Sequence, residues 1–255
     1  MQGFLQGKRG LVVGVANDQS IAAGCATVAR QQGARLALTY LSDRAKPHVE
    51  PVAEACEAEL LMPLDVTDDA QMDAVFDRIA RDWGGLDFLI HSIAFCPKQD
   101  LHGRVTDCSR TGFSQAMDIS VHSFTRMARR AEPLMTDGGA LLTVSYYGSE
   151  KVVDHYNVMG PVKAALESVT RYMAAELGPK GIRVNAISPG PLMTRAASGI
   201  DQFDALVEEA QTRAPLRRLV TIQEVGQMAA CLLSSQGGAV TGNVSYVDGG
   251  YHIMS

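Results

Sequence analysis

Short apolar runs recur along the chain, and the first three are each followed by a helical pattern. The helical patterns cover 20–32, a polar stretch around Val49 to Ala53, and 70–83. The apolar runs, which predict seven strands, cover 10–15, 35–40, 60–66, 86–93, 140–145, 183–188 and 244–247. Strands that are apolar throughout and alternate with helices form parallel sheets covered on both faces. We therefore predict an α/β fold: a Rossmann-like, doubly wound sheet of seven mostly parallel strands with helices on both faces.

Composition excludes several classes of protein. The net charge of -5 and the lack of a dense basic stripe argue against nucleic-acid binding. Five scattered cysteines, without CxxC or His/Cys ligand spacing, predict reduced thiols in a cytoplasmic protein and no metal site. No apolar run reaches the roughly 18 residues of a membrane span, and the N-terminus lacks a signal-peptide pattern, so we expect neither membrane insertion nor secretion. Without any linker-like composition shift, the 255 residues predict a single domain, 1–255.

The turn after the first strand is a candidate phosphate-binding site. It starts at Gly14 and holds Ser20 where the G-x-G-x-x-G fingerprint has a glycine. Gly14 permits a tight turn, Ser20 can cap the next helix or bond a phosphate oxygen, and the free N–H groups of that helix attract a pyrophosphate. A glycine after a strand often only turns the chain. Because this one stands between a strand and an Ala-rich helix, we interpret it as part of a dinucleotide site.

Two other strand ends fit the adenosine half of a dinucleotide. Asp65 and Val66 follow the third strand and can bind and pack against an adenine; the alternative is a helix N-cap by Asp65 or Thr67. After the second strand the chain reads Leu41-Ser42-Asp43-Arg44, so Leu41 is a candidate cofactor contact. No acidic residue stands at the strand tip to bind a free 2′-hydroxyl, whereas the serine and arginine can contact a phosphate. Both NADH and NADPH therefore stay open.

A tyrosine and a lysine seven positions apart, Tyr156 and Lys163, form a candidate catalytic pair. At 3.6 residues per turn this separation is almost two turns, so both side chains are expected on one helix face. Helical side chains lean toward the N-terminus, which brings the ammonium toward the phenol. A phenol near a fixed cation is a plausible proton donor, because the cation stabilises the phenolate left behind. Tyr146, slightly upstream, is a further aromatic candidate.

Six stretches spread over the chain form a recognisable set. They are Gly14…Ser20-Ile21-Ala22, His91-Ser92-Ile93-Ala94-Phe95, Ser145-Tyr146, Tyr156…Lys163, Asn185-Ala186-Ile187-Ser188-Pro189-Gly190-Pro191 and Val247-Asp248-Gly249-Gly250-Tyr251. Together they resemble the bacterial enoyl-acyl-carrier-protein reductases, a divergent branch of the short-chain dehydrogenase/reductase family. The most discriminating feature is the six residues between the tyrosine and the lysine. Ordinary short-chain dehydrogenases have three there, and a serine in place of Tyr146.

The resemblance implies NAD(P)H-dependent reduction of the 2,3 double bond of trans-2-enoyl thioesters, carried by acyl carrier protein or CoA, in fatty-acid or related acyl-chain synthesis. It implies that Tyr156 donates a hydrogen bond to the thioester oxygen, that Lys163 holds the nicotinamide ribose, and that Tyr146 lines the substrate pocket. It also implies a homotetramer and a substrate lid near 194–212, with Ile200, Phe203, Leu206 and Val207 on one helical face. The further cofactor contacts that it implies are Ile21, Ser92, Ile93, Ala94, Pro191, Leu192 and Thr194.

Some residues depart from the family pattern, and two other functions stay open. The departures bear on acyl chain length or on a specialised pathway more than on the hydride chemistry; they are Ala94, Cys96, Asp154 and Pro189. One alternative is a carbonyl reductase or alcohol dehydrogenase of the short-chain family, which Tyr146 and the long spacing disfavour. The other is a dinucleotide-binding sensor without catalysis, which the retention of Tyr156 and Lys163 disfavours.

Overall fold

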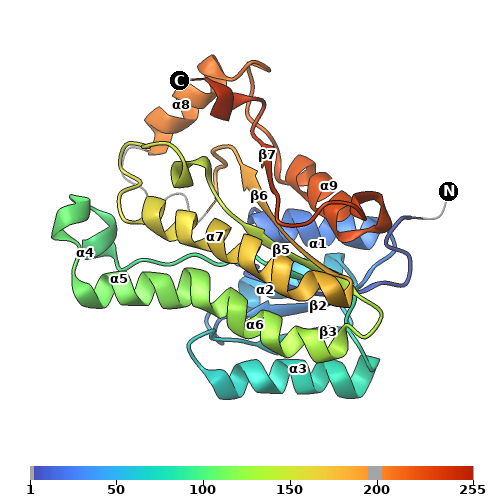
Figure 1. Ribbon diagram of the computed structural model, residues 1–255. Helices are drawn as coiled ribbons and strands as arrows, with labels where there is room; N and C mark the ends of the chain where they lie inside the picture. Colours follow the sequence, from blue (N-terminus) through green and yellow to red (C-terminus); the bar gives the residue numbers. More distant parts are fainter. Residues whose placement is uncertain (1–2, 195–202, 255) are drawn as a thin grey trace.

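The computed structural model describes residues 3–194 and 203–254, and its centre is one seven-stranded sheet (Figure 1). Neighbouring strands follow the order β3-β2-β1-β4-β5-β6-β7 and every pair runs parallel, so the predicted sheet is confirmed. The strand order reverses between β1 and β4, at the kind of switch point where such sheets bind ligands. The strands are β1 (Arg9–Val13), β2 (Arg35–Tyr40), β3 (Leu60–Pro63), β4 (Phe88–His91), β5 (Gly139–Val144), β6 (Ile182–Pro189) and β7 (Val244–Val247).

Helices cover both faces of the sheet and enclose two cores (Figure 1). One face packs against α3, α5, α6 and α7, with Phe124 and Leu166 fully buried there. The other packs against α1, α2 and α9 around Phe88 and Leu36. Because the central strands are buried on both sides, most of their residues are apolar; Arg9, His91 and Thr143 are the polar ones. The helices are α1 (Ile21–Gln31), α2 (Lys46–Ala55), α3 (Asp69–Trp83), α4 (Lys98–Leu101), α5 (Arg110–Met117), α6 (Ser123–Ala131), α7 (Met159–Leu177), α8 (Phe203–Arg213) and α9 (Ile222–Leu233).

Side-chain caps fix where several helices begin. The Asp68 carboxylate accepts hydrogen bonds from the N–H groups of Ala70 and Gln71 at the start of α3, so the expected capping alternative of Asp65 or Thr67 was wrong. At α9, Thr221 and Glu224 form a reciprocal capping box. Short 3-10 segments and one π turn, η2, make other connections: η1 (Val105–Asp107), η2 (Asp118–His122), η3 (Glu132–Leu134), η4 (Tyr147–Ser149), η5 (Gly178–Lys180), η7 (Ser235–Gly237) and η8 (Tyr251–Ile253).

Three strands are shorter than their apolar runs. β1 ends at Val13 instead of residue 15, β3 ends at Pro63 instead of residue 66, and β4 ends at His91 instead of residue 93. The last hydrogen bond between β4 and β1 runs from the N–H of Ser92 to the carbonyl of Val13, the final residue of β1. Beyond it the chain is free to turn into the site. Across residues 3–194 and 203–254, no helix combines the length and the apolar character needed to cross a bilayer.

Candidate active site

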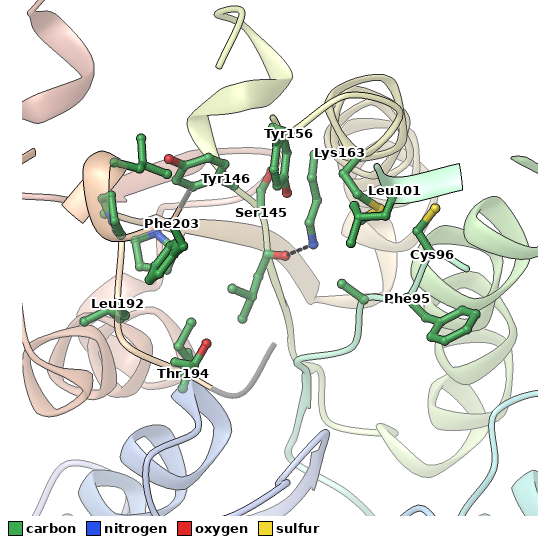
Figure 2. A pocket seen from close by; sticks show the side chains of 18 of the residues that line it. Phe95, Cys96, Leu101, Ser145, Tyr146, Tyr156, Lys163, Leu192, Thr194 and Phe203 are labelled. Carbon is green, nitrogen blue, oxygen red and sulfur yellow. Dashed lines mark hydrogen bonds between the residues drawn. The ribbon is translucent and has the colours of Figure 1, made fainter. Parts of the chain in front are cut away.

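A cavity of about 500 Å³ lies at the carboxyl ends of β4, β5 and β6, beside the start of α1. Figure 2 shows Tyr146, Tyr156 and Lys163 along one side, with Phe203 and Leu192 on one flank. Its wall brings together the predicted residues Ile21, Ala94, Tyr146, Tyr156, Lys163, Pro191, Leu192 and Thr194. Other lining residues are Phe95, Cys96, Lys98, Leu101, Val144, Ser145, Met159, Pro189, Gly190, Phe203 and Leu206.

The β1–α1 turn gives the site a helix N-terminus. Gly14 has a φ of +105°, and a Cβ built there would lie 2.1 Å from the carbonyl oxygen of Ser92, so only glycine fits. Ser20 is the N-cap of α1: its hydroxyl donates to the Asn17 carbonyl at 2.7 Å and accepts from the N–H of Ala23. The hydroxyl is therefore held within the turn, which supports capping over phosphate binding for Ser20. The free backbone N–H groups of the first turn of α1 keep their affinity for an anion.

Tyr156 is not on the helix that carries Lys163, contrary to the prediction. Helix α7 begins at Met159, and Tyr156 lies in the turn before it. The residues on either side, His155 and Asn157, have left-handed backbone conformations with φ of +63° and +47°, which interrupt any helix. Pro161 in the first turn of α7 also fits a helix start, where its missing N–H costs nothing. The two side chains nevertheless line the same cavity.

Tyr146 and Tyr156 line the cavity side by side, and Tyr147 packs against Tyr146 from outside the cavity wall. The ring of Tyr146 contacts those of Tyr147 and Tyr156 edge to face, each with centroids 4.9 Å apart. The Tyr146 hydroxyl oxygen is buried and finds no hydrogen-bond partner within the described part of the chain. A buried hydroxyl without a partner costs free energy, so this group is suited to meet a ligand atom.

Lys163 is a buried cation at the base of the cavity. Its side chain is 5% exposed, and Nζ donates to the Val144 carbonyl at 2.7 Å, as the dashed line in Figure 2 shows. Burial lowers the pKa of Lys163 to about 8, and the nearby carboxylate of Glu167 works against this decrease. Burial likewise lowers the pKa of His91, behind the site, to about 3, so that imidazole is neutral. Lys163 therefore stays largely cationic at neutral pH.

Tyr156 is held in its protonated form. Burial, and secondarily Glu167, raises the pKa of Tyr156 above that of a free phenol. The protonated phenol is the form that can donate a hydrogen bond or a proton, so the donor role expected of Tyr156 stays a prediction.

The residues expected at the adenosine half lie outside the cavity wall. Leu41 is 62% exposed just after β2. Oδ1 of Asp65 accepts from both the N–H and the hydroxyl of Thr67, while Val66 is buried. Two further predicted cofactor contacts, which do not belong to the adenosine half, also lie outside the cavity wall: Ser92 packs against Gly14, and Ile93 packs on the core. Their roles toward a cofactor stay predictions.

The segment after β6 and helix α8 closes the other flank. Pro191, Leu192 and Thr194 line the cavity as predicted, whereas Ile187 is fully buried within β6. In the expected lid near 194–212, Phe203 and Leu206 reach the cavity wall. Ile200 lies outside the described residues.

Several cavity residues carry no motif and were missed by sequence reasoning. Val144 ends β5, Met159 begins α7, and Leu101 comes from the short helix α4. Ser120, in the π turn, accepts from the N–H of Phe95 at 2.9 Å and donates to its carbonyl, so it fixes the wall at that point. Their only sequence signal was position after a strand or within an unremarkable helix.

The arrangement fits a nicotinamide dinucleotide. The cavity connects Ile21, in the first turn of α1, with Lys163 and the buried hydroxyl of Tyr146. The close approach of Gly14 to Ser92 leaves the turn free of side-chain bulk. A helix N-terminus for the pyrophosphate and a lysine for ribose hydroxyls are the groups that such a cofactor needs.

Comparison with known proteins agrees with this geometry. A family model described as Enoyl-(Acyl carrier protein) reductase matches residues 14–252. The chain belongs to this family. A relative named Enoyl-[acyl-carrier-protein] reductase [NADH] 1, from Rhizobium meliloti, is 52% identical over 252 residues, covering 99% of this chain and 93% of the relative. Membership of the enoyl-acyl-carrier-protein reductases confirms the predicted family and the prediction of an oxidoreductase.

Solved structures of the family match the whole fold. The enoyl-acyl-carrier-protein reductase of Anaplasma phagocytophilum, in complex with NAD, has a TM-score of 0.96 and 48% identity, covering 100% of this chain and 97% of that one. The Bacillus cereus enzyme, with NADP+ and an indole naphthyridinone, has a TM-score of 0.96 and 45% identity, covering 99% of both chains. A nicotinamide cofactor, NADH or NADPH, is thus confirmed at the level of the family.

Proposed function

We propose that this chain uses NADH or NADPH to reduce the 2,3 double bond of trans-2-enoyl thioesters of acyl carrier protein, in fatty-acid synthesis. The observation that carries the proposal is the placement of Tyr156, Tyr146 and Lys163 on one cavity at the sheet's carboxyl edge, next to the α1 turn. The family membership supports the same reaction. It favours this function over a carbonyl reductase, an alcohol dehydrogenase or a sensor without catalysis.

The residues of the cavity fit the charge changes of the reaction. The chemistry that a bound nicotinamide cofactor supplies is hydride transfer to the β-carbon, which shifts negative charge onto the thioester oxygen. Tyr156 donates a hydrogen bond to that oxygen, and this bond strengthens as the charge develops. Because burial keeps the phenol protonated, the donor is in place before the reaction starts. Tyr146 contacts the Tyr156 ring and orients it against the acyl group.

Lys163 and the turn residues bind the cofactor. The Lys163 ammonium faces the cavity from its base and binds the ribose hydroxyls nearest the nicotinamide. Gly14, Ser20 and Ile21 place the N-terminus of α1 at the pyrophosphate, and Pro191, Leu192 and Thr194 line the opposite side. Ser92, Ile93 and Ala94 pack at the nicotinamide ribose. Leu41, Asp65 and Val66 contact the adenosine.

Apolar residues shape the acyl route. Phe203 and Leu206 of α8 and Leu101 of α4 line the cavity and exclude water from the acyl chain. Helix α8 is the described part of the lid near 194–212, within a single catalytic domain spanning 1–255. A lid that closes over substrate commonly completes such a site.

We also propose the wider setting of the enzyme. CoA thioesters share the reactive group and are alternative substrates. The exposed apolar side chains of Ile253 and Met254 at the C-terminus support assembly into a homotetramer. The cytoplasm, where acyl carrier proteins receive their acyl chains, is the proposed location. Light scattering on the purified chain tests the assembly, and a monomer at micromolar concentration would contradict it.

One assay tests the reaction. Oxidation of NADH and of NADPH is followed in parallel with crotonyl and longer trans-2-enoyl thioesters of acyl carrier protein and of CoA, then with ketones. We expect turnover of the enoyl thioesters and none of the ketones. Turnover of ketones alone would support a carbonyl reductase instead. Cofactor binding without any turnover would support a sensor.

A further inference from the structure

Glu167 is a buried acid behind the cavity, four residues after Lys163 on α7. It is 3% exposed, and its Oε1 accepts hydrogen bonds from the hydroxyls of Ser145 at 2.5 Å and Ser149 at 2.6 Å. A buried carboxylate is costly unless it is hydrogen-bonded and near a cation. Residues four apart lie on the same helix face. Glu167 and Lys163 therefore point, from successive turns of α7, to the same segment, residues 144–149.

These two side chains hold consecutive residues of that segment. Lys163 binds the Val144 carbonyl, while Glu167 binds the next residue, Ser145, and then Ser149. Tyr146 lies between the two serines, so both ends of its loop are fixed to α7. A shift of this loop would displace the aromatic residues of the site.

The loop also packs closely on the ring of Tyr156. A Cβ built at Gly148 would lie 2.6 Å from Cδ1 of Tyr156, so backbone and ring are in direct contact. The Tyr146 ring adds its edge-to-face contact to the same ring. The hydrogen bonds of Glu167 consequently restrain the position of the phenol that meets the substrate.

Glu167 also supplies negative charge near Lys163. The titratable groups that face Lys163 are His91 from β4, the phenols of Tyr146 and Tyr156, and Glu167 itself. His91 is neutral and both phenols stay protonated, because burial lowers the pKa of His91 and raises the pKa of Tyr146 and Tyr156. On the Glu167 side, burial and the carboxylate of Glu150 raise the pKa of Tyr246 of β7, and the carboxylates of Glu167 and Asp248 add to this increase. The carboxylate of Glu167 thus opposes the effect of burial on the ammonium.

We propose that Glu167 is a positioning residue of the enoyl reductase: it fixes the loop of Tyr146 against Tyr156 and acts as the counter-charge that keeps Lys163 cationic. The role in turnover rests on the proposed function, whereas the role toward Lys163 also governs cofactor binding and is measurable without turnover. Loss of the carboxylate charge is expected to move the titration of Lys163 to lower pH by about one unit.

The test compares Glu167→Gln with Ser149→Ala. Glutamine keeps the shape and removes the charge, while the alanine variant removes one hydrogen bond and keeps the charge. The dissociation constant of NADH, from its fluorescence, and kcat/KM for crotonyl-acyl carrier protein are measured from about pH 6 to 9, over the window set by Lys163. For Glu167→Gln we expect near-native NADH binding at pH 6 and about fivefold weaker binding at pH 8, because the cationic fraction falls from about one half to about one tenth.

Ser149→Ala is expected to leave the alkaline limb of both profiles in place, whatever it does to the absolute rate. The proposal is overturned if Glu167→Gln and the parent chain lose NADH binding at the same pH. If Glu167→Gln does not fold, Glu167→Asp replaces it: the shorter acid keeps the charge but withdraws from the serines. Its alkaline limb should stay unshifted with a reduced kcat, and a shift of a full unit would refute the charge role. A parent chain that binds NADH but turns over no enoyl thioester contradicts the proposed function alone.

Discussion

Replacing Tyr156 with phenylalanine removes one hydroxyl and leaves the rest of the site in place. The ring is 8% exposed and keeps its edge-to-face contact with Tyr146, so the midpoint of thermal unfolding should move by no more than about 2–4 °C, the equivalent of about 1 kcal/mol. Loss of one donor to a developing oxyanion raises the barrier by roughly 3–4 kcal/mol. That increase corresponds to a decrease in kcat of roughly 10²- to 10³-fold.

The assay separates turnover from cofactor binding. Steady-state oxidation of NADH with crotonyl-acyl carrier protein gives kcat, and quenching of protein fluorescence gives the NADH dissociation constant, which we expect to change less than about twofold because Lys163 holds the ribose. Tyr172→Phe is the matched control: this tyrosine is on α7 but 77% exposed, and its loss should change neither quantity. A Tyr156→Phe enzyme with kcat within a factor of about three of the parent would refute the oxyanion role.

Three other changes probe the cofactor site and the Tyr156 turn. Because the pKa of Lys163 is about 8, activity and NADH affinity should fall as the pH rises past 8, and Lys163→Ala should weaken both at all pH values; a profile flat to about pH 10 would contradict this. Gly14→Ala should lower the unfolding midpoint by about 4–8 °C, from a strain of at least about 2 kcal/mol, while Gly178→Ala, with open space around its Cα, should be nearly neutral. Asn157 has a left-handed backbone with a φ of +47°, and its side chain donates to the Leu101 carbonyl at 2.8 Å. Asn157→Gly loses only the hydrogen bond and should lower the unfolding free energy by about 1 kcal/mol, whereas Asn157→Ala also strains the backbone and should lower it by about 2 kcal/mol. Equal costs would show that the left-handed backbone is unstrained.

The sheet could be predicted from the sequence because its signal is local and redundant. Every strand is a short apolar run, and the alternation of such runs with helical patterns permits few topologies. The predicted ends of β3 and β4 were too late in the chain, because apolar residues continue there after the strands stop pairing. The place where a strand ends depends on its neighbour: β4 stops pairing where Gly14 turns β1 away.

The active site was predicted in composition more than in geometry. Motif residues such as Tyr146, Tyr156 and Lys163 meet at one cavity, but the helix expected to hold both members of the pair begins after Tyr156. Two left-handed residues cause this, and nothing in the identity of His155 demands that conformation. Glu167 could not be recognised for another reason: an acid on a helix usually indicates an exposed face, and its burial follows only from the packing of α7 on β6 and η4.

Burial acts on the pKa values of Tyr156 and Lys163 in the same sense, favouring the neutral form of each, but with different consequences. It favours the protonated phenol of Tyr156, which is the form that donates a hydrogen bond, and it opposes the charged form of Lys163, which is the form we propose to bind ribose. A site that needs both a neutral phenol and a cationic amine within one apolar cavity therefore needs a counter-charge that stabilises the charged amine and does not stabilise a phenolate. In our proposal Glu167 does this from the next turn of α7, behind the cavity, where it raises the pKa of Lys163 and also that of Tyr156. One buried acid thus sets both protonation states in the required direction, whereas an acid in the cavity itself would repel the anionic oxygen formed during the reaction.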